Sequence, residues 1–119
     1  MSLLRAQVRK FDQGTPDEWW QMSLLDLDVV ADGRNEDEVL RDVEHALFGE
    51  YELAVLHGRP PFIDRMREDC PQDVIDAWTN GNKIPAKLNL PQRVRVALAI
   101  AFKSASTVDF EVGVCERAA

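Results

Sequence analysis

Residues 35–61 read NEDEVLRDVEHALFGEYELAVLHGRPP, and this stretch carries the clearest structural pattern in the chain. Asn35 is a favourable N-cap residue, and Glu38 three positions later completes a capping-box pattern. Apolar side chains then recur at helical spacing as far as Gly58, a natural C-terminal cap, which two prolines follow closely. The pattern predicts a helix of about 22 residues, roughly 33 Å long.

Apolar segments that precede this helix predict a sheet. The predicted strands cover residues 4–11, residues 18–23 and the alternating set Leu25, Leu27 and Val29. A turn cluster that contains both Gly and Pro, residues 12–17, separates the first two strands. Two adjacent leucines, Leu24 and Leu25, interrupt the alternation, so we expect a bulge or a short break there.

The second half of the chain starts with a mixed-charge connector, residues 59–71. Pro71 opens a short predicted helix, and residues 83–90 predict an extended segment. The last thirty residues fit two interpretations. Strict alternation in residues 94–102 and 108–114 favours a C-terminal β-hairpin with its turn at residues 103–107, whereas three alanines in the first of these segments favour a helix.

Composition sets the class of protein. The chain has 119 residues, 45% of them hydrophobic, which is typical of a globular protein. The predicted helices and strands indicate an α+β fold divided into residues 1–62, a connector with a short helix at 63–82, and a C-terminal segment at 83–119. No apolar run reaches the roughly 18 residues of a membrane span, and the N-terminus lacks a secretory pattern. Cys70 and Cys115 form no paired motif. We therefore expect a cytoplasmic protein with no membrane partner.

The sequence offers no convergent catalytic set. His45 and His57 lie about 18 Å apart along the predicted helix, too far apart to share a metal ion, and no glycine-rich phosphate loop is present. Asp26 and Asp28 would share one face of a strand, where they could hold a cation, act as an acid–base pair or guard a strand edge. We expect no enzyme activity, no cofactor and no metal.

Charge and aromatic residues point instead to a binding protein. The formal net charge of −7 disfavours non-specific wrapping of nucleic acid and is well matched to a basic protein partner. Of the paired tryptophans Trp19 and Trp20, one would enter the core and the other could anchor a contact. The candidate partner-binding residues are Trp19, Asp26 and Asp28.

The stretch VVADGRNEDEVLRDVEHALFGEYELAVLHGRPPF, residues 29–62, resembles the HicB family of antitoxins. The shared features are a Val-rich strand, a Gly turn, a capped helix start, an alanine near the middle of the helix and a closing Gly-x-Pro. The resemblance covers about half of the chain. It implies a three-stranded antiparallel sheet with one long helix packed across it. It also implies that the partner is a small basic toxin that cleaves messenger RNA, whose active site the antitoxin blocks.

Antitoxins of this kind often carry a C-terminal DNA-binding piece. The stretch LNLPQRVRVALAIAFKSAST, residues 88–107, resembles the start of a ribbon-helix-helix. This resemblance implies that Lys87 and Asn89 face the major groove from a two-chain ribbon, and that backbone amides near Thr107 hold a phosphate. The chain would then also regulate its own operon. On the alternative interpretation, Lys87 and Asn89 lie on the solvated face of a strand.

The sequence thus predicts a HicB-like antitoxin that sequesters a small basic toxin and autoregulates its operon. An alternative is a stand-alone structural or oligomerisation domain of the same shape, with neither toxin nor DNA. We expect self-association in either case.

Overall fold

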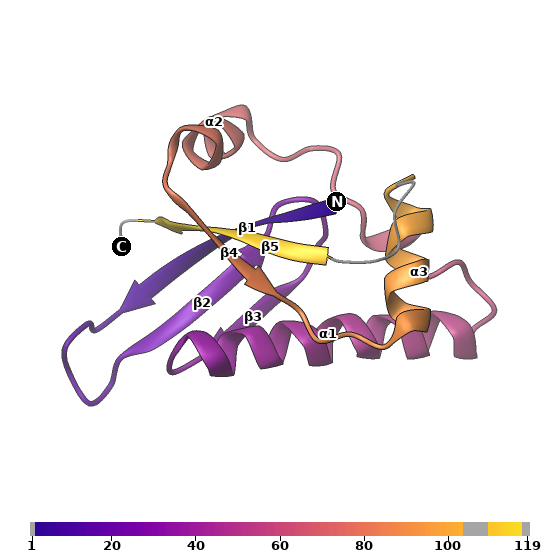
Figure 1. Ribbon diagram of the computed structural model, residues 1–119, viewed down its shortest axis with the longest axis horizontal. Coiled ribbons are helices and arrows are strands. Elements are labelled where there is room, and N and C mark those ends of the chain that lie inside the picture. The colour runs from indigo at the N-terminus through magenta and orange to yellow at the C-terminus, as the bar shows by residue number, and fades with distance from the viewer. Residues whose placement is uncertain (1, 104–109, 118–119) are drawn as a thin grey trace.

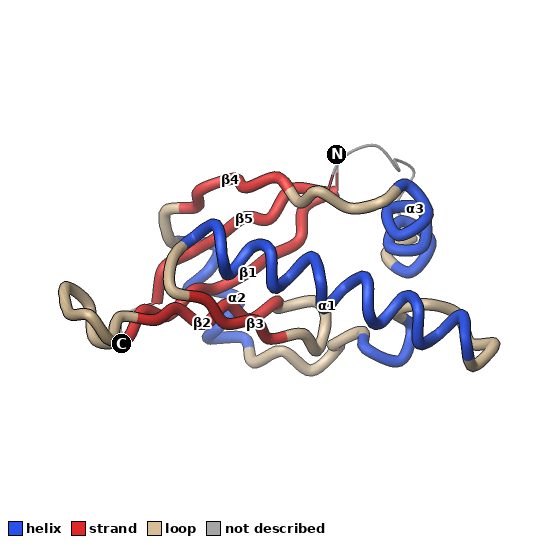
Figure 2. The backbone as a smooth tube through the Cα atoms, turned by 90° about the horizontal axis from the view of Figure 1, so that it is seen from below, coloured by secondary structure: helices blue, strands red, loops and turns tan. Residues whose placement is uncertain are grey.

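The computed structural model describes residues 2–103 and 110–117, with the backbone alone for residues 2–3, 83–85 and 110–117. It contains a five-stranded mixed sheet in the order β3-β2-β1-β5-β4. The long helix α1 covers one face of the sheet, and the short helix α2 lies on the opposite face (Figures 1 and 2). Helix α3 lies beyond one end of the sheet, beside the C-terminal half of α1. The predicted α+β class is confirmed.

The first three strands form an antiparallel meander, as predicted. They are β1 (Ser2–Phe11), β2 (Trp19–Leu24) and β3 (Val30–Gly33). Within the meander, β1 pairs with β2 through contacts such as Val8 with Met22, and β2 pairs with β3. Alternate residues of β1, namely Leu4, Ala6 and Val8, are buried toward α1. Period-two alternation is therefore what gives this sheet one apolar face.

The predicted break at Leu24 and Leu25 is confirmed. Strand β2 ends at Leu24, and its N–H donates to the carbonyl of Val29 across a bend. Both leucines are buried, and Leu25 packs against Trp78 of α2 rather than in the main core. Because the chain bends here, the third strand begins only at Val30, five residues later than the alternating pattern predicted.

Helix α1 (Glu36–Leu56) follows the sequence pattern closely. Asn35 Oδ1 accepts the N–H of Glu38 at 3.0 Å, and the Glu38 carboxylate accepts the N–H of Arg34 at 2.8 Å. The first contact satisfies an amide that the first helical turn leaves without a partner, and the second ties the Glu38 side chain to the residue before the N-cap. The helix ends before Gly58, which has a φ of +67°. Its apolar stripe packs on the sheet through Val39, Val43 and Leu47.

The connector contains a 3₁₀ turn at Ile63–Arg65, and it leads to α2 (Gln72–Asn80) and β4 (Lys83–Lys87). The predicted short helix and extended segment are confirmed. Beyond β4, Leu88 and Leu90 are buried while Lys87 and Asn89 are exposed, which is the alternation expected of the solvated-strand interpretation.

Both interpretations of the last thirty residues require correction. Residues 92–101 form helix α3 (Gln92–Ala101), not the first strand of a hairpin. Strand β5 (Phe110–Arg117) follows in place of the second helix that a ribbon-helix-helix needs. Moreover, β4 pairs antiparallel with β5 of its own chain, and β5 also pairs in parallel with β1. Residues 1–62 and 83–119 therefore share one sheet.

The apolar residues of α3 alternate in the sequence, which predicted a strand, but they also match the spacing of a helix. Val94, Leu98 and Ala101 lie on one helical face and are buried, whereas Ile100 is largely exposed. The alanines between them are strong helix formers and poor strand residues. The predicted turn at residues 103–107 falls mostly outside the described residues, as does Thr107.

We predict opposite effects on stability for alanine substitution at Gly33 and Gly49. A Cβ at Gly33 would lie 2.8 Å from the Glu38 carbonyl carbon and closer still to the Val39 nitrogen, whereas one at Gly49 meets nothing within 4 Å. Gly33→Ala should lower the free energy of unfolding by about 1–3 kcal/mol, because the start of α1 must shift. Gly49→Ala should raise it by up to about 1 kcal/mol.

Urea titration followed by circular dichroism measures both changes. If Gly33→Ala were as stable as the parent chain, the close approach of β3 to the start of α1 would not be a constraint on this fold.

Candidate functional site

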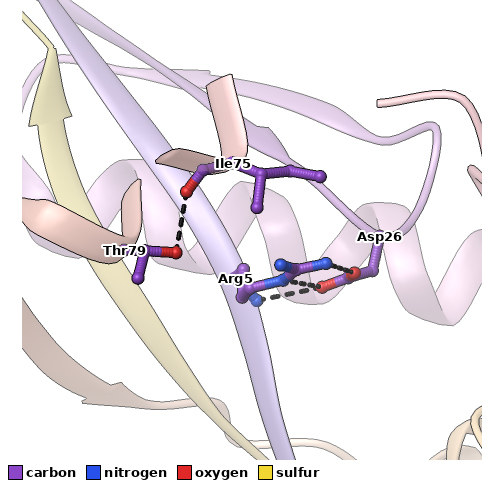
Figure 3. Close-up of polar contacts among 4 residues, drawn as sticks. All are labelled: Arg5, Asp26, Ile75 and Thr79. Atoms are coloured by element: carbon purple, nitrogen blue, oxygen red, sulfur yellow. Dashed lines mark hydrogen bonds and ion pairs between the residues drawn. The ribbon is translucent and has the colours of Figure 1, made fainter. Parts of the chain in front are cut away.

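On the outer face of the sheet, the face opposite α1, the carboxylate of Asp26 accepts hydrogen bonds from Arg5. Arg5 Nη2 donates to Asp26 Oδ1 at 2.6 Å, and Arg5 Nε donates to Oδ2 at 3.2 Å. The backbone N–H of Arg5 adds a longer contact to Oδ2 at 3.4 Å. The two side chains point toward each other in Figure 3. The hydrogen bond that Arg5 donates to Asp26 raises the pKa of Arg5, although partial burial of the guanidinium opposes the rise.

Helix α2 packs against this pair. The guanidinium carbon of Arg5 lies 5.9 Å from the ring centroid of Trp78, which is buried together with Leu25. Cys70 and Val74 border the same small cluster. On α2 itself, Thr79 Oγ1 donates to the Ile75 carbonyl at 2.8 Å (Figure 3). Arg5 and Asp26 therefore serve to hold α2 and the bend after β2 against β1.

The two aspartates predicted as partner-binding residues do not form a pair. Asp26 is engaged by Arg5, and the side chain of Asp28 lies 3.8 Å from Arg65 and is 70% exposed. Both flank Leu27, whose backbone forms a bridge with Met66 of the connector. The residues lie in the bend between β2 and β3, so they are not part of the strand that the sequence predicted there.

Among the side chains that the structure describes, no group of three or more His, Cys, Asp or Glu residues is arranged to hold a metal ion. His45 is exposed on α1, and His57 is the C-cap residue of the same helix. His45 therefore lies on α1 and His57 directly follows its last residue, so the two histidines are separated along one helix, as the sequence predicted.

Trp19, the third predicted partner-binding residue, is placed for contact. It begins β2 opposite Phe11 in the β1–β2 register, and the two rings stack at 4.2 Å with an interplanar angle of 12°. Trp19 remains 36% exposed, whereas Trp20 packs against the main core. The guanidinium of Arg9 lies 5.9 Å from the Phe11 ring. Stacking thus fixes a partly exposed aromatic pair at the turn end of the β1–β2 hairpin.

A shallow polar hollow adjoins the aromatic pair. It measures about 110 Å³ and is lined by Gln7 and Arg9 of β1 and by Gln21 and Ser23 of β2. These side chains share the outer face of the sheet, because Gln7 lies opposite Ser23 and Arg9 lies opposite Gln21. The hollow is too small for most organic ligands. It can supply hydrogen bonds at the edge of a protein contact.

Negative charge is concentrated around the same end of the molecule. This acidic end comprises residues 9–20 and 30–42: the end of β1, the β1–β2 turn, the start of β2, strand β3 and the first two turns of α1. Its acidic residues are Asp12, Asp17, Glu18, Asp32, Glu36, Asp37, Glu38 and Asp42. Its basic residues are Arg9, Lys10, Arg34 and Arg41. The meander and the helix start bring these acids together at one end of the fold (Figure 1).

An apolar groove lies at the opposite end. It has a volume of about 580 Å³, with one wall formed by Tyr51 and Val55 of α1 and the other by Val96 and Ile100 of α3. Pro60, Pro61 and Ile63 of the connector complete it. No residue pattern described above predicted this groove. One signal was available, because Leu53, Val55 and Leu56 fall outside the apolar stripe of α1 and are exposed.

Two of the residues predicted to contact DNA, Lys87 and Asn89, neither belong to the acidic end nor line the groove. Lys87 ends β4 and is exposed, and the backbone N–H of Asn89 donates to Glu44 of α1 at 2.9 Å. Their predicted roles depended on a ribbon shared by two chains, and β4 instead pairs within its own chain. Thr107 lies outside the described residues.

Comparison with known proteins returned no family model, no curated protein and no solved structure that matches this chain. Among the described helices, none combines the length and the apolar character needed to cross a bilayer.

We predict that the two aspartates differ in their effect on stability. Asp26→Asn should lower the free energy of unfolding by about 1–2 kcal/mol, because it weakens a charged hydrogen-bond pair whose side chains are roughly three-quarters buried. Asp28→Asn removes the same charge from an exposed contact and should change stability by less than about 0.5 kcal/mol. Chemical denaturation of both variants provides the measurement, and equal losses would contradict a structural role for the Arg5–Asp26 contact.

Proposed function

We propose that this chain is a HicB-like, antitoxin-type binding protein whose acidic end docks a small basic protein. One observation carries the proposal: an exposed tryptophan, held rigid by stacking on Phe11, lies within that acidic end. Tryptophan is among the residues most enriched at energetically dominant contact points.

Charge favours a basic partner over other classes of ligand. The acidic end holds eight acidic and four basic side chains, and its excess of four acids accounts for more than half of the net charge of −7. Three of its carboxylates, those of Glu18, Glu38 and Asp42, accept backbone N–H groups, which orients them without cancelling their charge. Such a field accelerates the approach of a basic protein and repels nucleic acid.

Rigidity is the second argument. A side chain that is already fixed in the free protein loses little conformational entropy on binding. The Phe11–Trp19 stack has this property, since the hairpin register places the two residues opposite each other. The polar hollow beside them, lined by Gln7, Arg9, Gln21 and Ser23, would supply hydrogen bonds around the aromatic anchor. A hydrophobic centre with a polar rim is the usual anatomy of a protein interface.

The HicB-like assignment draws support from the element order. An antiparallel meander followed by a capped long helix is the arrangement that the resemblance of residues 29–62 implies. On this proposal the partner is a small basic toxin that cleaves messenger RNA, and the acidic end covers the cationic surface that such a toxin presents to its substrate. Asp26 and Asp28 take no part, since they lie at the other end of β2.

We predict that Trp19→Ala weakens binding to the product of the adjacent small reading frame at least tenfold, mainly by faster dissociation. The paired substitution Asp17→Asn and Glu18→Gln should instead slow association and flatten its dependence on salt, because it removes two charges from the docking field. Surface plasmon resonance at several salt concentrations separates the two rate constants.

The matched control is Glu68→Gln with Asp69→Asn, which removes the same two charges from exposed positions in the connector. This control should leave both rate constants within about twofold of the parent values. If the neighbouring protein fails to bind the parent chain, or does no harm when expressed alone, the antitoxin proposal is lost. Equal effects of the two charge pairs would place the docking surface elsewhere.

A further inference from the structure

The polar hollow on the outer face of the sheet contains an unmatched cation. Its lining side chains, Gln7, Arg9, Gln21 and Ser23, are all partly buried. Within the part of the chain that the structure describes, no hydrogen bond or ion pair engages any of these four side chains, and the Arg9 guanidinium lies 5.9 Å from the Phe11 ring. Arg9 is also one of the four basic residues of the acidic end. It therefore opposes a basic partner unless something at the interface matches its charge.

We propose that the hollow receives a single carboxylate, which is an aspartate or glutamate side chain of the protein that docks at the acidic end. The inference rests on the proposed function, which supplies the docked protein, and it adds one feature that this protein must have. An otherwise basic partner needs one acidic residue at a fixed position beside its contact with Trp19.

The position of the hollow brings it into any contact made through Trp19. The β1–β2 register places Trp19 opposite Phe11 and Arg9 opposite Gln21, on the same face of the sheet. Two residues along a strand span about 7 Å. An interface of standard size covers about 800 Å² on each side, a patch roughly 30 Å across. A protein that docks on Trp19 therefore also covers the hollow.

Desolvation decides which group must fill the hollow. A guanidinium that loses water without gaining a partner is strongly unfavourable, so covering Arg9 with an apolar or basic surface would oppose docking. A carboxylate removes this penalty, because the guanidinium can donate two parallel N–H groups to its two oxygens. Gln7, Gln21 and Ser23 offer further N–H and O–H donors. The hollow thus selects among basic partners, since it penalises those that lack an acid at this position.

Size and charge favour a carboxylate over other anions. The hollow measures about 110 Å³, which admits a functional group that projects from a larger molecule rather than a complete organic ligand. Arg9 is the one charged residue among the described side chains that line it. A phosphate monoester carries nearly two negative charges at neutral pH, and the surrounding acidic end would repel the charge that Arg9 leaves unmatched. A carboxylate carries one charge, which Arg9 matches.

Titration with acetate tests the site without any partner. Acetate and its neutral isostere acetamide are added separately to the parent chain at constant ionic strength, and NMR follows the side-chain amides of Gln7 and Gln21. Acetate should shift both signals saturably, with half-saturation in the millimolar range expected of so small a ligand, whereas acetamide should not. Arg9→Gln should abolish the response. Arg41→Gln, which removes the same charge from an exposed position on α1, should preserve it.

Binding to the product of the adjacent small reading frame gives a second test, in which the direction of the change is diagnostic. Arg9→Gln makes the acidic end more negative, so it should tighten binding to a basic protein if only the summed charge mattered. Our proposal predicts the reverse, a loss of affinity of at least tenfold in surface plasmon resonance. Arg41→Gln is again the matched control, since Arg41 also belongs to the acidic end, and it should bind at least as tightly as the parent chain.

The two tests separate this inference from the proposed function. If Arg9→Gln bound the neighbouring protein as tightly as the parent chain or more tightly, the carboxylate subsite would be wrong and the docking proposal would stand. If the neighbouring protein did not bind at all, the docking proposal would be lost and the acetate titration would decide the chemistry of the hollow. Equal responses to acetate and acetamide, a response that survives Arg9→Gln, or inorganic phosphate binding at least tenfold more tightly than acetate would overturn the inference. Circular dichroism checks that each variant is folded.

Discussion

The packing of α1 across the β1–β2–β3 meander is the contact on which the rest of this structure depends. Val39, Val43 and Leu47 are fully buried against the sheet, and burial of each such side chain contributes about 1.5–3 kcal/mol. Gly33 brings the end of β3 against the first turn of α1, and Asn35 and Glu38 close that turn with hydrogen bonds. This arrangement fixes where α1 begins, and therefore which residues gather at each of its ends.

The length of α1 separates two chemically different surfaces. Its first turns join the hairpin in an acidic end that contains the Phe11–Trp19 stack, and its last turns form one wall of an apolar groove. The middle of the helix is occupied by the core, so neither surface depends on the other for its shape. The two surfaces therefore differ in both position and chemistry.

The outer face of the sheet is secured by a different kind of contact. Arg5 binds Asp26 through its side chain and backbone and lies against Trp78 of α2. The bend after β2 makes this possible, because it turns Leu25 toward α2 and presents Asp26 to β1. Asp26 illustrates how a conspicuous acidic residue can be structural: its charge is already matched within the fold. Trp19, by contrast, is held by its stack on Phe11 and keeps 36% of its surface exposed.

The sequence by itself determined the elements whose signals are local. Asn35, Glu38 and Gly58 define the ends of α1 through hydrogen bonds and backbone geometry within a few residues, and alternation defines β1. Only the tertiary structure decided the course of residues 92–103 and 110–117. Their alternating apolar pattern suits a strand or, with its alanines, a buried helix, and packing of Val94 and Leu98 in the core favours the helix. The place of β5 between β1 and β4 depends on pairing with residues more than a hundred positions away, which no local pattern encodes. The groove was unpredictable for the same reason, because its two walls come from helices about forty residues apart in the sequence.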